Sequence, residues 1–288
     1  MDSYLQPQDD GLALRRSGQW VAEKLDYLRR YINIFSTSMR GKPWREINYI
    51  DLFSGPGKCL INRTSTVLFG SPLLAVTAQH PFTNYFFVDF DENSIDALKQ
   101  RCGTSDSGRQ IQYFVGDSNT IVKEVVDQIL ETDSIQIPGQ WSSLNLAFLD
   151  PEGLELHWDT VAALAKAQRM DLIIHYSQGG LNRYMSKACE ANEQNTVDQF
   201  FGGTEWRGIF EEHGNNHRLL IDHYRQKLKN VGYQEVLRDD EVGDEPLMRN
   251  ARRRAPLYRL LFASKHALGH TFWHAVTRRD VYGQQRLF

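Results

Sequence analysis

Four aspartates follow or close apolar runs of the chain, at Asp51, Asp89, Asp117 and Asp150. If each run is a parallel strand, the four carboxylates meet at one edge of a sheet, where open α/β sheets bind their ligands. Carboxylates accept hydrogen bonds from hydroxyl and amino groups, so the set predicts a site for a nucleotide-like ligand. The alternative is that these acids only cap helices, a role in which Asp is favoured. Capping suits Asp117, whereas Asp91 is better placed than Asp89 to cap the next helix.

The first of these acids leads into a turn of small residues. The stretch Tyr-Ile-Asp-Leu-Phe-Ser-Gly-Pro-Gly spans 49–57. Gly55 and Gly57 permit backbone angles, and a close approach of a ligand, that a Cβ would forbid. The spacing is not Gly-x-Gly-x-x-Gly, so an ordinary dinucleotide site is disfavoured. A tight Gly-Pro-Gly turn without a ligand is the alternative.

A sheet must position these acids, and strands and helices alternate along the chain as such a sheet requires. Apolar strands separated by helices are predicted at 47–53, 85–89, 111–115, 144–149 and 171–176. This pattern indicates a parallel sheet with both faces covered. Two later strands, at 234–237 and 257–263, are predicted to add an antiparallel edge, joined by the charged stretch 238–256. The predicted fold is a Rossmann-like, doubly wound α/β domain with a mostly parallel seven-stranded sheet.

The same pattern predicts how the chain is divided. Residues 1–14 are expected to be a disordered leader, and residues 15–288 one domain. Apolar residues from Val21 to Phe35 recur at alternating spacings of four and three and predict an amphipathic N-terminal helix. The polar, helix-prone stretch 181–216 predicts an inserted helical lid. Residues 58–69 predict a loop, which either folds over the ligand or is a tolerated surface insertion.

Composition excludes several classes of protein. The chain has 288 residues, 41% of them apolar, and no apolar run approaches the roughly 20 residues of a membrane span. A signal-peptide layout is not seen. Its three cysteines, Cys59, Cys102 and Cys189, lack metal-ligand spacing and would leave one unpaired, which favours a reducing cytoplasm. The net charge of −3 does not indicate nucleic-acid binding as a whole.

Five stretches together carry a family resemblance: residues 49–57, Gly-Ser-Pro-Leu at 70–73, Phe-Val-Asp-Phe-Asp at 87–91, Phe-Leu-Asp-Pro-Glu-Gly-Leu at 148–154, and Leu-Tyr-Arg-Leu-Leu-Phe-Ala-Ser-Lys-His at 257–266. Their order resembles class I methyltransferases that depend on S-adenosylmethionine (SAM). More closely, the chain resembles the three-Cys-motif partner proteins (TcmP), a bacterial family with a methyltransferase-like fold. The resemblance implies SAM as cofactor and a three-cysteine-motif protein as partner. It does not supply the methyl acceptor.

The resemblance also implies roles for individual residues. The methionine end of SAM would lie against Asp51 and the turn, the ribose hydroxyls against Asp89, and the adenine amino group against Asp117. The complete implied cofactor set is Asp51, Phe53, Ser54, Gly55, Pro56, Gly57, Asp89, Asp117 and Ser118. The implied catalytic set, nearest the methyl group, is Asp150, Pro151 and Glu152.

The sequence Asp150-Pro151-Glu152-Gly153 is similar to the Asp-Pro-Pro-Tyr motif of enzymes that methylate exocyclic base amines, in which the aromatic residue stacks on a flipped base. Gly153 replaces that aromatic residue and Glu152 the second proline, so base methylation is in question. Trp158 or Tyr176 would then have to stack on the base instead, although both are better explained as buried core residues. A cytosine C5 mechanism is excluded because the chain has no Pro-Cys nucleophile.

Three further features are weighed against structural explanations. His175, at the end of the fifth strand, is either a base beside the pocket or a structural histidine. The cluster of Arg249, Arg252, Arg253 and Arg254 either binds phosphate, and so nucleic acid, or is a solvated loop. His266, His270 and His274 have helical spacing but lack an acidic partner, so no metal site is expected.

These observations predict a SAM-dependent methyltransferase that acts on an unidentified acceptor, with nucleic acid or a nucleotide as the leading class. The alternative is a non-catalytic, SAM-binding partner subunit of a three-cysteine-motif protein.

Overall fold

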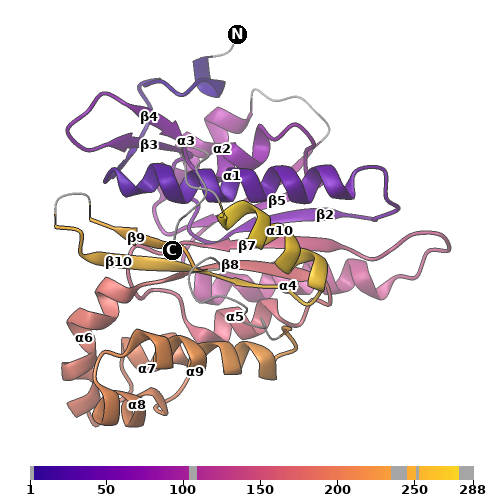
Figure 1. The fold of residues 1–288 in the computed structure, drawn as a ribbon. Helices are drawn as coiled ribbons and strands as arrows, with labels where there is room; N and C mark the ends of the chain where they lie inside the picture. Colours follow the sequence, from indigo (N-terminus) through magenta and orange to yellow (C-terminus); the bar gives the residue numbers. More distant parts are fainter. Residues whose placement is uncertain (1–2, 104–108, 235–244, 251–252, 279–288) are drawn as a thin grey trace.

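The computed structural model describes residues 3–103, 109–234, 245–250 and 253–278. A seven-stranded sheet forms its centre, in the order β6-β5-β2-β7-β8-β10-β9 (Figure 1). The strands are β2 (Ile47–Asp51), β5 (Asn84–Asp89), β6 (Gln110–Val115), β7 (Leu144–Leu149), β8 (Met170–Tyr176), β9 (Leu247–Arg249) and β10 (Pro256–Ala263). All neighbours pair in parallel except β10, which runs antiparallel to both β8 and β9. The predicted α/β fold and mixed seven-stranded sheet are confirmed.

The strand order reverses beside β2. The chain proceeds outward from β2 to β5 and β6, then returns to place β7 on the other side of β2. The connection from β2 to β5 and the connection from β7 to β8 therefore run in opposite directions along the sheet. Ligands of doubly wound sheets bind at such a switch point. Asp51 and Asp150 stand on its two sides.

Helices cover both faces of the sheet. One face packs on α1 (Trp20–Met39), α2 (Ser71–Val76), α3 (Glu92–Cys102) and α10 (Ala267–Thr277). The other packs on α4 (Ser118–Ser134), α5 (Trp158–Leu164), α6 (Gln178–Glu190), α7 (Thr196–Phe201), α8 (Trp206–His213) and α9 (His217–Asn230). Figure 1 shows the two layers, with α1 and α10 on one side of the sheet and α4 and α5 on the other. None of the helices in the described ranges is long and apolar enough to span a membrane.

A small second sheet replaces the predicted loop at 58–69. Strands β3 (Lys58–Ile61) and β4 (Val67–Phe69) form an antiparallel hairpin, and β1 (Arg15–Ser17) pairs with β3 in parallel. Each strand has only three or four residues, too few for an alternating pattern to be recognised in the sequence. The hairpin carries the segment before α1 to the edge of the main sheet where β2 ends.

The N-terminal segment is ordered from Ser3 onward, in contrast to the predicted leader. A short 3₁₀ helix spans Ser3–Leu5. The side chain of Asp10 is fully buried and forms ion pairs with Lys58 at 2.7 Å and with Arg101 at 2.6 Å. A second bond, of 2.9 Å from Arg101 Nε, makes the arginine contact bidentate. This anchor explains the order, because a buried acid with two cationic partners fixes a segment that composition alone leaves free.

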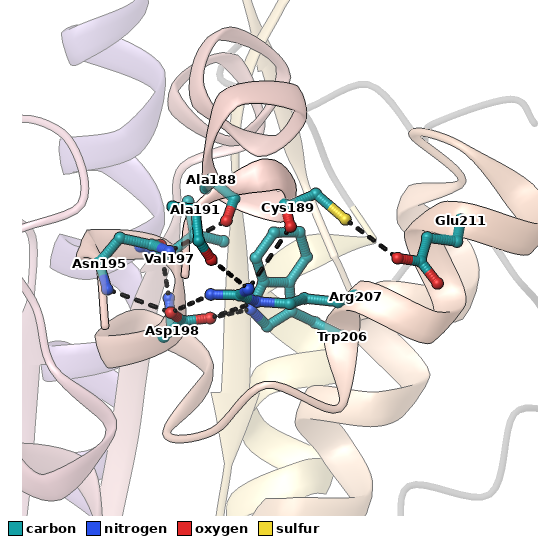
Figure 2. A network of polar contacts seen from close by, with 9 residues as sticks. All are labelled: Ala188, Cys189, Ala191, Asn195, Val197, Asp198, Trp206, Arg207 and Glu211. Atoms are coloured by element: carbon teal, nitrogen blue, oxygen red, sulfur yellow. Dashed lines mark hydrogen bonds and ion pairs between the residues drawn. The ribbon is translucent and has the colours of Figure 1, made fainter. Parts of the chain in front are cut away.

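The predicted helical insertion at 181–216 contains most of α6 together with α7 and α8. A polar cluster around the buried Asp198 joins them (Figure 2). Its carboxylate accepts hydrogen bonds from Trp206 Nε1 at 2.9 Å and Arg207 Nη2 at 2.7 Å, and Arg207 Nη1 also donates to Ala191 O at 2.6 Å. These bonds link the end of α6 to α7 and α8. The role of the insertion as a lid stays a prediction.

The edge strand beside β10 differs from the predicted one. Of the predicted strand 234–237, only Gln234 lies within the described residues, where its N–H donates to Ser264 O. Strand β9 comes instead from within the charged stretch 238–256 and pairs with β10. A three-residue edge strand flanked by charge carries too little apolar pattern to be predicted.

Candidate functional site

The side chain of Asp51 stabilises the turn that follows β2. This carboxyl group is fully buried and accepts hydrogen bonds from the Phe53 N–H, at 3.3 Å, and from the Ser71 hydroxyl. Burial raises the pKa of Asp51 to about 7, although these two bonds oppose the shift. Asp51 therefore stabilises the turn without presenting its carboxylate to solvent. The predicted contact between Asp51 and a ligand remains untested.

The two glycines of the turn have different functions. Gly55 has a φ of 60°, and its N–H donates to Asp89 Oδ2 at 2.7 Å. Gly57 has a φ of 87°, and a Cβ there would lie 2.8 Å from Leu98 Cδ1, so it is required for packing. Between them, the Pro56 carbonyl accepts a hydrogen bond from Arg101. Arg101 therefore fixes the second half of the turn.

Ser54 supplies a polar group that the protein leaves unused. Its N–H donates to Val88 O at 2.9 Å, which ties the turn to β5. Its hydroxyl is buried and, among the described residues, has no hydrogen-bond partner. Such orphaned groups are uncommon in folded proteins. A ligand at the turn would satisfy this hydroxyl.

Asp89 ends β5 with a half-buried carboxylate. Gly55 N–H and Asp91 N–H donate to its two oxygens, at 2.7 and 2.9 Å. A carboxylate has about four acceptor sites, so these bonds orient the group and leave sites for further donors. Asp91, not Asp89, caps α3 through the N–H groups of Asn93 and Ser94. The prediction that Asp91, not Asp89, is placed to cap this helix is confirmed.

Two exposed apolar residues neighbour Asp89, one in sequence and one across the strand pair, and the sequence analysis missed both. Phe90 is 81% exposed and Val115 47% exposed. Val115 pairs with Asp89 in the register of β5 and β6, so both side chains lie at the same edge of the sheet. An exposed phenyl ring beside a carboxylate at the ends of parallel strands offers a stacking surface next to a hydroxyl acceptor.

Asp117 and Ser118 lie at the start of α4. Asp117 is exposed and caps the helix, accepting bonds from Asn119 N at 3.0 Å and Thr120 Oγ1 at 3.2 Å. The capping alternative for this residue is therefore observed, although an exposed carboxylate retains further acceptor sites. Ser118 is buried and donates to Leu52 O, which fixes the turn against α4.

Asp150 forms the most highly charged cluster of the site. This residue is 8% exposed. Lys24 of α1 donates to Oδ2, and His175 Nδ1 lies 3.0 Å from Oδ1, so each oxygen has a partner. Burial alone would raise the pKa of Asp150, but Lys24 and His175 hold it well below its usual range. The His175 ring also packs against Tyr258, with the ring centroids 4.2 Å apart.

The other two residues of the predicted catalytic set differ in exposure: Pro151 is buried and Glu152 is exposed. Pro151 and Glu152 both line the cavity described next. Glu152 pairs with Arg15 at 2.9 Å. Arg15 also lies over the turn, 3.8 Å from the position that a Cβ on Gly55 would take. The ordered N-terminal segment therefore contributes a cation between the turn and the cavity.

A cavity of about 1110 Å³ opens beyond Asp150, between the N-terminal segment and α6. Asp117, Pro151 and His175 border it, whereas Asp51, Asp89 and the turn do not. Cations predominate on its other walls: Arg15, Arg16, Lys24, Arg183 and Lys187. The site therefore has two parts, a shelf around Asp89 and Phe90 and a cationic cavity beyond Asp150.

Several other predicted candidates lie away from both parts. Trp158 and Tyr176 are buried in the core, which confirms the structural interpretation of each. Arg249 donates to Arg254 O within a turn. Arg252 lies outside the described residues. No set of three metal-ligating side chains is found in the described part of the chain.

No family model matches the chain, and neither does any curated protein. The TcmP resemblance thus has no support from these comparisons.

Among solved structures, the chain is similar to a putative RNA methyltransferase from Pyrococcus horikoshii, with 11% identity over 88% of this chain and 94% of that one and a TM-score of 0.39. It is also similar to the O-methyltransferase TomG from Streptomyces achromogenes, in complex with SAM, with 9% identity over 88% and 92% and a TM-score of 0.40. A third is a SAM-dependent methyltransferase from Geobacter sulfurreducens in complex with S-adenosyl-L-homocysteine, with 13% identity over 72% and 64% and a TM-score of 0.33. The fold assignment itself rests on the strand order described above.

Proposed function

We propose that this protein is a SAM-dependent methyltransferase that binds its cofactor on the shelf at the carboxyl ends of β2, β5 and β6. The observation that supports this proposal most strongly is the Asp89 carboxylate, which two backbone N–H groups orient. The next residue in the chain is the exposed Phe90. One carboxylate can accept both hydroxyls of a ribose, and an adjacent ring can stack on a purine. The left-handed Gly55 and the unpartnered hydroxyl of Ser54 suit the amino-acid end of SAM.

In this proposal the protein contributes position and electrostatics. SAM, when bound, supplies a methyl group already activated by its sulfonium charge. Asp89 and the turn hold the cofactor, while the cavity beyond Asp150 admits the acceptor. Holding both reactants in a fixed geometry lowers the barrier by removing the entropic cost of their encounter.

The charges of the cavity support nucleic acid or a nucleotide as the acceptor class. Arg183 and Lys187 are one helical turn apart on α6, both are exposed, and both line the cavity. The 49%-exposed Tyr184 lies between them in sequence, and Arg16 also lines the cavity. Cations that contact phosphates, together with aromatic rings that stack on bases, are how proteins hold single-stranded nucleic acid. These residues are better placed for such a role than the predicted arginine cluster at 249–254.

Calorimetry with SAM tests the cofactor proposal. Asp89→Ala removes the ribose acceptor and should weaken SAM binding by about 1.5–3 kcal/mol, the usual scale for a hydrogen bond to a charged group. The matched control is Asp96→Ala, which removes an exposed acid of α3 that pairs with Lys99. Binding of SAM by neither wild type nor control, or equal binding by all three proteins, would overturn the proposal.

One observation favours the alternative function, a SAM-binding partner subunit without catalysis. Asp150 is only 8% exposed and each of its oxygens already has a partner, Lys24 or His175, so it is less accessible to an acceptor than the half-buried Asp89. The partner would be a three-cysteine-motif protein, as the TcmP resemblance implies. Labelled SAM offered with RNA, DNA, nucleotide and protein fractions separates the two functions. SAM binding without transfer to any fraction would support the partner subunit.

A further inference from the structure

His175 has the geometry of a base whose partner fixes its protonation state. It lies near the end of β8, is 5% exposed, and borders the cavity. Nδ1 is 3.0 Å from Asp150 Oδ1, and the ring packs on Tyr258. Among the described residues, Nε2 has no hydrogen-bond partner. Nδ1 is therefore hydrogen-bonded within the protein, while Nε2 is available to a group bound in the cavity.

The charges around the ring determine which nitrogen carries the proton. Asp150 has a pKa well below its usual range, so it is an acceptor at neutral pH and Nδ1 must be the donor. Burial lowers the pKa of His175, and the adjacent Lys24 lowers it further, although Asp150 and Glu155 oppose the shift. The imidazole is thus neutral, protonated on Nδ1, with a lone pair on Nε2.

We infer that His175 is the general base of methyl transfer, that Asp150 is its positioning residue, and that the acceptor is a hydroxyl group. This inference rests on the proposed function. It reassigns Asp150, predicted to orient the acceptor directly, to orienting the base. The carboxylate also stabilises the imidazolium that forms when His175 takes a proton.

The chemistry of the step accounts for the choice of a hydroxyl group. The acceptor oxygen forms a bond to the methyl carbon, the carbon–sulfur bond breaks, and its electron pair stays on sulfur. The hydroxyl proton passes to His175 Nε2. An amine can attack without a base and release its proton to water afterwards, whereas a neutral hydroxyl is a weak nucleophile that a positioned base activates. An amine acceptor would also have to reach the Asp150 carboxylate, which is 8% exposed and already bonded to Lys24 and His175.

A conservative variant tests the base. His175→Gln should lower methyl transfer from labelled SAM by about 10²–10⁴-fold, the range for loss of a general base. SAM affinity, measured by calorimetry, should stay within threefold of wild type. The matched control is His213→Gln, which removes a partly exposed histidine of α8 outside the cavity lining. Transfer by His175→Gln at the wild-type rate would overturn the inference, and so would the absence of transfer by a wild type that binds SAM. Failure of wild type to bind SAM would overturn the proposed function instead.

The pH dependence of methyl transfer distinguishes a catalytic base from a histidine with a purely structural role. Transfer should fall as the pH drops through the pKa of His175, which lies below the ordinary 6.5. Lys24→Met removes a cation that lowers this pKa, so the acidic limb should move to higher pH. An acidic limb that stays in place in Lys24→Met would count against His175 as the titrating base.

Nitrogen NMR of the wild type tests the protonation state even if the variants fold poorly. The ¹⁵N shifts of His175 should report protonation on Nδ1 at pH 7. Asp150→Asn should reduce this preference, because its amide can also donate to the ring. Protonation of His175 on Nε2, or on both nitrogens at pH 7, would overturn the inference.

Discussion

Removal of the Asp10 carboxylate should destabilise the protein strongly, although the residue lies in a segment predicted to be disordered. Asp10→Ala leaves Lys58 and Arg101, whose side chains are fully buried, without their shared counter-charge. Loss of one partner of a buried pair costs about 3–5 kcal/mol. At roughly 2 °C per kcal/mol for a large domain, the thermal midpoint should fall by about 6–10 °C.

The matched control is the neighbouring Asp9→Ala. Asp9 is exposed and accepts only a local bond from Gly11 N–H, so its loss should stay within about 0.5 kcal/mol. Chemical denaturation of wild type and both variants gives the comparison. Equal stabilities of Asp10→Ala and Asp9→Ala would refute the reasoning.

The pH dependence supplies a second check. Burial opposes ionisation of Asp10, but Arg101 and Lys58 hold its pKa well below the ordinary 3.8. An acid with a lowered folded-state pKa contributes stability above its unfolded pKa and loses it as the pH falls through the folded value. The stability difference between wild type and Asp10→Ala should therefore be full at neutral pH and narrow below about pH 3.8. A difference that does not change with pH would show that the ion pairs are not its cause.

Three other predictions concern the turn, the shelf and the insertion. Gly57→Ala should lower the free energy of unfolding by roughly 2–5 kcal/mol, because the new Cβ adds left-handed backbone strain and a clash with Leu98. The control Gly41→Ala, with a φ of 71° in open space, should cost only the strain. Equal losses of stability on denaturation would refute the clash. Phe90→Ala should weaken SAM by about 1–3 kcal/mol in calorimetry without lowering the thermal midpoint, and unchanged affinity would remove the stacking role. If residues 181–216 form a lid, their amide hydrogens should exchange rapidly in the free protein and more slowly when SAM and acceptor are bound. Exchange as slow as that of β2 and β7, with and without ligands, would contradict the lid.

The strands and the acids that follow them could be predicted from the sequence, because each signal is local. Apolar runs such as Leu144–Leu149 need only be buried on both faces to form a parallel strand. The Asp91 and Asp117 caps follow from a side chain and the N–H groups two or three residues later. Such short-range physics does not depend on the rest of the fold.

The partners of these acids could not be predicted, because they come from distant parts of the chain. Lys24 is 126 residues from Asp150, and on its own it is a polar residue of an amphipathic helix. The bond between Asp10 and Arg101 spans 91 residues. Phe90 resembles any aromatic residue after a strand, and its exposure depends on which other elements pack around it. Tertiary contacts, which have no local pattern, thus determine the protonation of His175 and the order of the N-terminal segment.

A crystal structure with S-adenosyl-L-homocysteine bound would test the central claim most directly. The proposed function predicts the ribose hydroxyls against the Asp89 carboxylate, the adenine on Phe90, and the sulfur directed toward Asp150 and the cavity beyond it. Density for the ligand elsewhere on the protein, with the shelf at Asp89 empty, would contradict it.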